Sequence, residues 1–150
     1  MPQAHPFALP CTCSRLRRAT RAVTQLYDDA LGSIGLRVTQ LSLLRTLQRE
    51  GPLRIGELAA HNLLDRTALS RNLDPLAERK LVAIVPGRDA RTRQVTLTRQ
   101  GTAAIAAAAP LWEHAQREVA RRIGRDRLDN LYAVLRDMEA LHPAPAGHSA

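Results

Sequence analysis

The sequence lacks a long apolar run, a cysteine framework and an internal repeat. Its alanine-rich stretch, Thr102–Ala109, is far too short to span a membrane, and Pro110 follows it directly. Residues 1–10 do not combine a cationic start with an apolar stretch, so we expect no secretory signal peptide. The chain has two cysteines, Cys11 and Cys13, and therefore cannot depend on a disulfide framework. We expect a cytoplasmic protein with no membrane partner.

Signatures of an enzyme are missing as well. The sequence contains no Gly-x-Ser-x-Gly turn, no His-Glu-x-x-His helix and no glycine-rich phosphate loop. His61, His114, His142 and His148 have no partners at metal-ligand spacing, and each is interpreted as a surface or tail residue. The sequence therefore predicts a protein that is not an enzyme and needs no cofactor.

What the sequence does have is positive charge. Its 150 residues include 22 basic and 14 acidic ones, which gives a net charge of +8, and Lys80 is the only lysine. Guanidinium groups favour bidentate contacts with phosphate, so an arginine-rich surface supports a nucleic-acid partner. The charge alone is not decisive, because basic proteins also bind membranes and acidic proteins. The length fits one domain with helical extensions.

Two consecutive helices are predicted in the middle of the chain. Gly51–His61 reads as a break followed by a short apolar helix, and Arg66–Leu81 as a second helix. Leu69, Leu73 and Leu76 recur at helical spacing, so one stripe of the second helix packs inward. Four residues lie off this stripe, near the amino end of the helix: Arg66, Thr67, Ser70 and Arg71. A helix-turn-helix needs this arrangement, since the first turns of its second helix meet base edges and phosphates in the major groove.

A β-hairpin is predicted directly after these helices. Leu81–Pro86 and Gln94–Leu97 read as its strands, with Val95 and Leu97 pointing inward. The tip between the strands carries charged residues, namely Arg88, Asp89, Arg91 and Arg93. Such a ribbon suits insertion into a groove lined with phosphates, although a solvated surface hairpin is the alternative. Two helices followed by a charged hairpin predict a mostly α fold with a small β-hairpin, a winged helix-turn-helix.

Four further helices are predicted around this unit. Their spans are Arg15–Leu31, Gln40–Glu50, Thr98 to about Ile123, and Asp126–Leu141. Ser14 and Thr39 are the expected caps of the first two, and a bend is expected at Pro110. Residues 1–13 are expected to form a flexible segment that carries the two cysteines, and residues 142–150 a flexible tail.

The chain resembles the MarR-type transcriptional regulators over roughly residues 14–141. Three motifs carry the resemblance: Gly56-Glu57-Leu58-Ala59, the helix Thr67–Lys80 running into Leu81-Val82, and the wing string Asp89-x-Arg91…Val95-x-Leu97-Thr98-x-x-Gly101. The resemblance implies that the DNA-binding part spans about residues 39–98. It also implies that Arg91 enters the minor groove and that Asp89, two positions earlier, braces it.

The resemblance further implies a homodimer on an inverted-repeat operator in double-stranded DNA. The terminal helices carry more apolar surface than one small wing domain covers, and this fits dimerisation through the first and the last two helices. A two-fold dimer presents two recognition helices about one helical turn apart on DNA. A monomer that closes its own core is the alternative.

Two residues depart from the family pattern. Lys80 stands where glycine is frequent, so a left-handed turn there would cost about 1 kcal/mol. Pro75 lies inside the predicted recognition helix, where it removes one backbone hydrogen bond and produces a kink. The kink falls beyond Arg71, so the DNA-facing turns should be spared.

The string Cys11-Thr12-Cys13 precedes the expected start of the first helix and admits three interpretations. Three cations stand nearby in the sequence: Arg15, Arg17 and Arg18. The helix dipole and these cations would favour a thiolate that reacts with peroxides. The pair, with or without His5, would alternatively bind a thiophilic metal. The third interpretation is two inert thiols.

The first helix is similar to that of the organic-hydroperoxide regulators (OhrR type) within the MarR family. Cys13 falls on their reactive cysteine, and Tyr27 falls on a tyrosine that hydrogen-bonds its sulfur. Arg17 stands where a second tyrosine is usual. Cys11 is an added neighbour and a candidate disulfide partner for Cys13 of the same or the other subunit, although an i,i+2 disulfide is strained.

The favoured hypothesis is therefore a dimeric repressor that thiol oxidation at Cys13 and Cys11 releases from DNA. Release by a small aromatic ligand or by a thiophilic metal stays open as an alternative effector mechanism. A winged-helix module for protein–protein contact is the alternative of another class. Protein interfaces seldom concentrate unpaired arginines, which argues against that module.

Overall fold

A computed structural model describes residues 10–89 and 91–142 of the chain. Its elements are α1 (Thr12–Leu31), the short 3-10 helix η1 (Gly32–Ile34), α2 (Val38–Glu50), β1 (Leu53–Arg54), α3 (Ile55–His61), α4 (Arg66–Glu78), β2 (Val82–Pro86), β3 (Arg93–Leu97), α5 (Arg99–Ile123) and α6 (Arg125–Glu139). The predicted fold class, mostly helical with a small β-structure, is confirmed. His5, His148 and most of the expected flexible ends fall outside the described residues.

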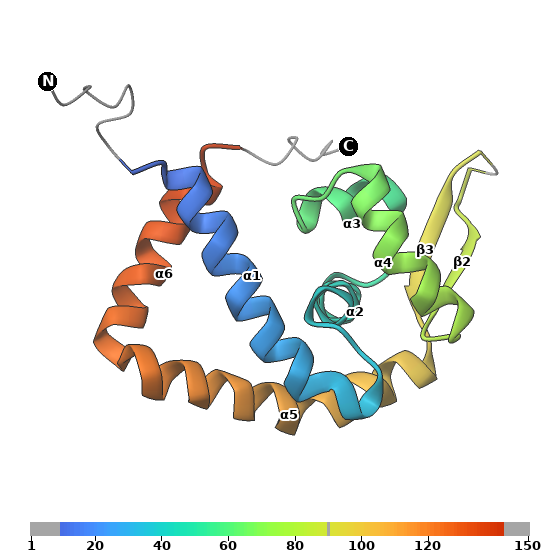
Figure 1. Cartoon of the computed structure of the whole chain (residues 1–150). Coiled ribbons are helices and arrows are strands. Elements are labelled where there is room, and N and C mark those ends of the chain that lie inside the picture. Colours follow the sequence, from blue (N-terminus) through green and yellow to red (C-terminus); the bar gives the residue numbers. More distant parts are fainter. Residues whose placement is uncertain (1–9, 90, 143–150) are drawn as a thin grey trace, which may run out of the picture.

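The helices form two groups that share α5 (Figure 1). Helices α1, α5 and α6 make an open three-sided frame, which we call the scaffold helices. Helices α2, α3 and α4 and the hairpin gather on the other side, and α2 contacts both α1 and α5. Helices α1 and α6 thus both contact α5, the helix that the two groups share.

The sheet has three antiparallel strands in the order β1-β3-β2. Val95 of β3 lies opposite Ile84 of β2 and Leu53 of β1. The sequence analysis missed β1, because a strand of two residues shows no alternating pattern. Val95 is fully buried, as predicted.

The core of the molecule is built mainly from leucine. Buried residues of one cluster come from the end of α1, the inner faces of α2, α3 and α4, the sheet and α5: Leu31, Leu36, Leu41, Leu43, Leu44, Leu47, Leu58, Leu69, Leu73, Leu76, Leu81, Val82, Val95 and Ala108. The predicted stripe of α4 is therefore correct, and it fixes which face of this helix remains outside.

Two helices begin earlier than predicted. Helix α1 starts at Thr12 with Cys11 as its N-cap residue, so Ser14 lies inside the first turn and is not the cap. Helix α2 starts at Val38, whose backbone N–H donates to the Asp28 carboxylate of α1 at 2.7 Å. A cap supplied from a different helix leaves no local signal, and for this reason Thr39 was wrongly taken as the cap.

The turn after α4 adopts the left-handed conformation that was anticipated at Lys80, where φ is 57°. A non-glycine residue in this region is strained by about 1 kcal/mol. Helix α4 continues through Pro75 and ends at Glu78, before the predicted end at Leu81. Leu63, in the turn between α3 and α4, is also left-handed, with φ of 50°.

Candidate nucleic-acid interface

The amino end of α4 is fixed by a side-chain cap and by its buried stripe. The Asp65 carboxylate accepts a hydrogen bond from the Ala68 backbone N–H at 2.7 Å, which satisfies one of the free donors of the first turn. The sequence analysis did not assign this role to Asp65, although aspartate before a helix is a usual cap. With the leucine stripe inward, the opposite face of the first turns points outward.

That outward face carries the four residues that the sequence singled out for the major groove. All four are exposed, and they share two turns of α4: Arg66, Thr67, Ser70 and Arg71. Asn72, on the same helix, is held by two hydrogen bonds, one from the Thr39 hydroxyl at 2.8 Å and one to the Ala68 carbonyl at 2.9 Å. The arrangement joins α4 to α2 without using any of the four outward residues.

The hairpin tip is shaped by backbone hydrogen bonds. Gly87 N–H donates to the Thr92 carbonyl at 2.8 Å, and Thr92 N–H donates to the Asp89 carbonyl at 2.8 Å. The Asp89 carboxylate accepts from the backbone N–H of Arg91 at 3.0 Å. Asp89 therefore holds the backbone of Arg91 and not its guanidinium, and the Arg91 side chain is exposed.

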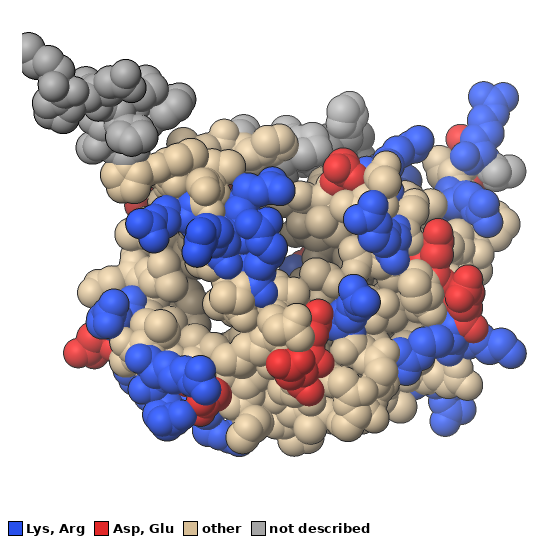
Figure 2. All heavy atoms as spheres, in the orientation of Figure 1, with Lys and Arg blue, Asp and Glu red and all other residues tan. Residues whose placement is uncertain are grey.

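The arginines of this region are exposed and carry no ion pairs to carboxylates in the described parts of the chain. They are Arg66 and Arg71 on α4 and Arg88, Arg91 and Arg93 on the hairpin. Figure 2 shows basic side chains gathered around the hairpin tip at the upper right. The outward face of α4 and the hairpin tip together present guanidinium groups that form no ion pairs in the described parts of the chain. Such groups suit contact with the phosphates that line the grooves of a nucleic-acid duplex.

The scaffold helices present a second kind of surface, which is apolar. Leu128 is the only residue of α6 that is buried, whereas large apolar side chains of α1, the end of α5 and α6 are exposed: Val23, Ile123, Leu131, Tyr132 and Val134. Exposed apolar side chains on several neighbouring helices become buried when a partner chain covers these helices. We call these five residues the apolar scaffold face.

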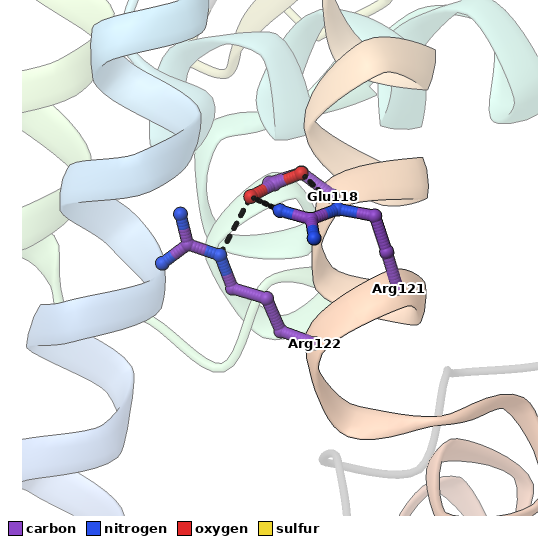
Figure 3. A network of polar contacts seen from close by, with 3 residues as sticks. All are labelled: Glu118, Arg121 and Arg122. Carbon is purple, nitrogen blue, oxygen red and sulfur yellow. Dashed lines mark hydrogen bonds and ion pairs between the residues drawn. The ribbon is translucent and has the colours of Figure 1, made fainter.

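An ion network lies at the carboxyl end of α5 (Figure 3). The Glu118 carboxylate accepts hydrogen bonds from Arg121 at 3.0 and 2.7 Å and from Arg122 at 2.6 Å. The bonds from Arg121 and then Arg122 hold the pKa of Glu118 at about 2. Both arginines are exposed and Glu118 is half-buried at the surface, so the network orders the surface of α5 and adds little to the stability of the fold.

Both cysteines are exposed at the start of α1, with Cys11 as the N-cap residue and Cys13 in the first turn. Tyr27 lies fourteen positions after Cys13 on the same helix, about 21 Å away along its axis. The structure therefore does not bring Tyr27 and Cys13 of one chain together. No group of three or more histidine, cysteine, aspartate or glutamate residues is placed to hold a metal within residues 10–89 and 91–142.

Tyr27 has a different partner. Its buried hydroxyl donates to the Gln116 amide oxygen of α5, and the Gln116 amide nitrogen donates to the Tyr132 hydroxyl of α6 at 2.8 Å. Burial, with a smaller contribution from Tyr132, raises the pKa of Tyr27, so its hydroxyl stays a donor. The expected tyrosine–sulfur contact is absent within the described chain, and Tyr27 instead links the three scaffold helices.

Comparison with known proteins gives a family profile and a set of similar structures. The profile of the MarR family matches residues 34–92. The transcriptional regulator MosR of M. tuberculosis, solved in complex with DNA, is 38% identical, with 89% of this chain and 100% of that chain covered and a TM-score of 0.75. A second MosR structure is 35% identical, covering 87% and 96% of the two chains, with a TM-score of 0.74.

More distant structures share the fold alone. BpsR of Bordetella bronchiseptica, whose DNA binding is regulated by 6-hydroxynicotinic acid, is 20% identical, with 91% and 99% of the chains covered and a TM-score of 0.80. A comparison with curated proteins gives no match. None of the helices in the described ranges has the length and apolar character that a membrane crossing requires.

Proposed function

Because the chain belongs to the MarR family of transcriptional regulators, we propose that it is a repressor that binds double-stranded DNA as a homodimer. The observation that carries this proposal is the pairing of an exposed arginine-bearing face on α4 with an exposed arginine-bearing hairpin tip. Arg66, Thr67, Ser70 and Arg71 contact base edges and phosphates of the major groove. Arg91 enters the adjacent minor groove, with Arg88 and Arg93 beside it and Asp89 holding the tip.

The apolar scaffold face supports the homodimer. A second copy that covers Val23, Leu131 and Val134 removes exposed apolar surface from water and brings two recognition helices onto one face. An inverted-repeat operator matches this two-fold symmetry. A protein-interaction module is the weaker candidate, because the arginines of α4 and of the hairpin tip form no ion pairs within the described residues.

Replacing the wing arginine tests the DNA contact. Arg91→Ala should weaken operator binding by about 1–3 kcal/mol, since a guanidinium in a groove is desolvated and close to phosphates. Arg93→Ala should have a smaller effect, because Arg93 belongs to β3 and lies nearer the body of the hairpin. The measurement is fluorescence anisotropy with a labelled operator duplex.

Arg117→Ala is the matched control for Arg91→Ala. Arg117 is an exposed arginine of α5, so its removal changes the net charge by the same amount and should leave operator affinity close to that of the wild type. Equal affinities of Arg91→Ala and the wild type would remove the hairpin from the interface.

For release from DNA, we propose oxidation at Cys13, with Cys11 as the resolving thiol. A peroxide transfers one oxygen atom to the Cys13 thiolate, which gives a sulfenic acid and water or an alcohol. The Cys11 thiol then displaces water to form a disulfide, or the sulfenic acid persists. Both sulfurs are exposed within the first turn of α1, so they are open to an oxidant and their modification disturbs the start of a scaffold helix.

Peroxide treatment of single cysteine variants tests this switch. Wild-type protein should lose operator binding after mild peroxide and regain it with a dithiol reductant, whereas Cys13→Ser should keep DNA binding throughout. Cys11→Ser should still respond but should stop at the sulfenic acid, which mass spectrometry detects as one added oxygen. Release of Cys13→Ser by peroxide, or an unresponsive wild type, would contradict the redox mechanism.

A small planar acid is the second candidate effector. Arg45 of α2 lies over the Trp112 ring of α5, 4.9 Å from its centroid, and these two residues and Leu41 line two hollows of the surface. A guanidinium beside an apolar, aromatic wall suits a carboxylate on a flat ring. Trp112 is the only tryptophan, so quenching of its fluorescence by such an acid, together with release of DNA, would favour this effector.

A further inference from the structure

Arg79 makes a long-range contact that the DNA interface does not explain. It is the first residue after α4, and its guanidinium donates to the Gly35 carbonyl at 2.6 Å and to the Ile34 carbonyl at 3.1 Å. These carbonyls belong to the η1 turn, which joins α1 to α2. One side chain thus connects the end of the recognition helix to the point where the scaffold helix α1 ends.

The two acceptors are arranged for a guanidinium fork. Gly35 adopts a left-handed conformation with φ of 64°, and its N–H donates back to the Gly32 carbonyl at 3.0 Å. The carbonyls of Ile34 and Gly35 follow the last turn of η1 and have no helical partner of their own. Two neighbouring acceptors match the parallel donors of arginine better than the single ammonium of lysine.

A second contact holds α4 at its middle. The Thr39 hydroxyl of α2 donates to the Asn72 side chain at 2.8 Å. These two polar contacts constrain the direction of the helix axis, in addition to the packing of the buried leucine stripe. Helix α4 is about 20 Å long, so a tilt of about 10° at its carboxyl end moves its amino end by about 3 Å.

We propose that Arg79 is a positioning residue for DNA recognition, which fixes the angle of α4 relative to the scaffold helices through its bonds to the η1 turn. The inference rests on the proposed DNA-binding function and adds the residue that sets its geometry. Arg79 does not touch DNA in this role. In a dimer, its effect is to hold the two recognition helices at one separation, so that both reach their half-sites together.

The contribution of Arg79 to folding is small. Its side chain is exposed, and exposed hydrogen bonds compete with water, so removal should change the melting temperature by only a few degrees. The left-handed Lys80 follows directly, and the Arg79 side chain bonds to Ile34 and Gly35 rather than to this turn. Arg79→Ala should therefore fold, and Arg79→Lys keeps the charge while losing the fork.

The test measures how DNA affinity depends on half-site spacing. A duplex is first selected by the wild-type protein from a random library, and its two half-sites are then moved apart or together by one and two base pairs. Arg79→Ala should bind the selected duplex about tenfold more weakly and should discriminate less between spacings than the wild type does. Arg79→Lys should resemble Arg79→Ala, and Arg117→Ala should resemble the wild type.

Salt titration of the same complexes separates positioning from direct phosphate contact. Arg79→Ala should keep the salt dependence of the wild type, because no phosphate contact is lost. The inference is overturned if the affinity of Arg79→Ala depends on half-site spacing as that of the wild type does. It is also overturned if Arg79→Ala lowers the slope of log affinity against log salt by about one and Arg79→Lys restores the wild-type affinity. Failure of the wild-type protein to enrich any duplex overturns the proposed function itself.

Discussion

Deletion of residues 126–150 is expected to abolish operator binding. It removes all of α6 except Arg125. The buried Leu128 is lost with it, and so is Tyr132, whose hydroxyl accepts a hydrogen bond from Gln116 of α5. The deletion also removes three residues of the apolar scaffold face and uncovers the side of α5 that contacts α6, so the protein should aggregate or remain monomeric. A monomer binds one half-site only. In a dimer, binding of one subunit raises the effective concentration of the other at the second half-site, and a monomer lacks this gain in affinity.

Light scattering after gel filtration and a gel-shift assay measure these two effects together. Removal of residues 143–150 alone is the control, because it leaves α6 complete, and it should preserve the dimer and its DNA binding. A soluble protein without residues 126–150 that remains dimeric and binds the operator would refute the role assigned to α6.

Substitution of Gly101 by alanine should destabilise the fold by about 1–3 kcal/mol or more. Gly101 lies in the first turn of α5, where a Cβ atom would overlap the Leu81 carbonyl oxygen and the Leu97 side chain. The backbone oxygen cannot move without disturbing the Thr98 hydroxyl, which caps α5 and donates to the carbonyls of Lys80 and Leu81.

Gly56→Ala is the matched control for Gly101→Ala. Gly56 is also in the first turn of a helix, but no atom lies within 4 Å of the position of an added Cβ. Alanine should be neutral or slightly stabilising at this position, since it lowers the entropy of the unfolded chain. Urea denaturation of both variants measures the difference, and equal midpoints would show that the close approach at Gly101 has no energetic consequence.

The fold was predictable where a pattern repeats along the chain. The stripe of Leu69, Leu73 and Leu76 determined which face of α4 is buried, and therefore which residues point outward. The start of α5 next to Thr98 and its end at Ile123 also lie where local sequence signals placed them, to within one residue. These features depend on neighbours within a few residues, which a single sequence displays directly.

Features that depend on distant residues were not predictable. The start of α2 is set by Asp28, ten positions away, and β1 exists only because Leu53 pairs with Val95. The hydroxyl of Tyr27 donates to Gln116, 89 positions later, and no local pattern indicates this pairing. The contact of Arg79 leaves no local signal, because arginine at the end of a helix is common and its acceptors at Ile34 and Gly35 belong to another part of the sequence.

The central claim, that exposed arginines of α4 and the hairpin bind duplex DNA, is tested most directly by the affinity of the wild-type protein for its selected duplex across a series of salt concentrations. Each phosphate neutralised releases counterions, so a dimer with several arginines per subunit predicts a linear fall of log affinity with log salt, with a slope steeper than about −4. The double variant Arg66→Ala, Arg71→Ala should flatten this slope. Affinity that is independent of salt, or an identical slope in the double variant, would contradict the account.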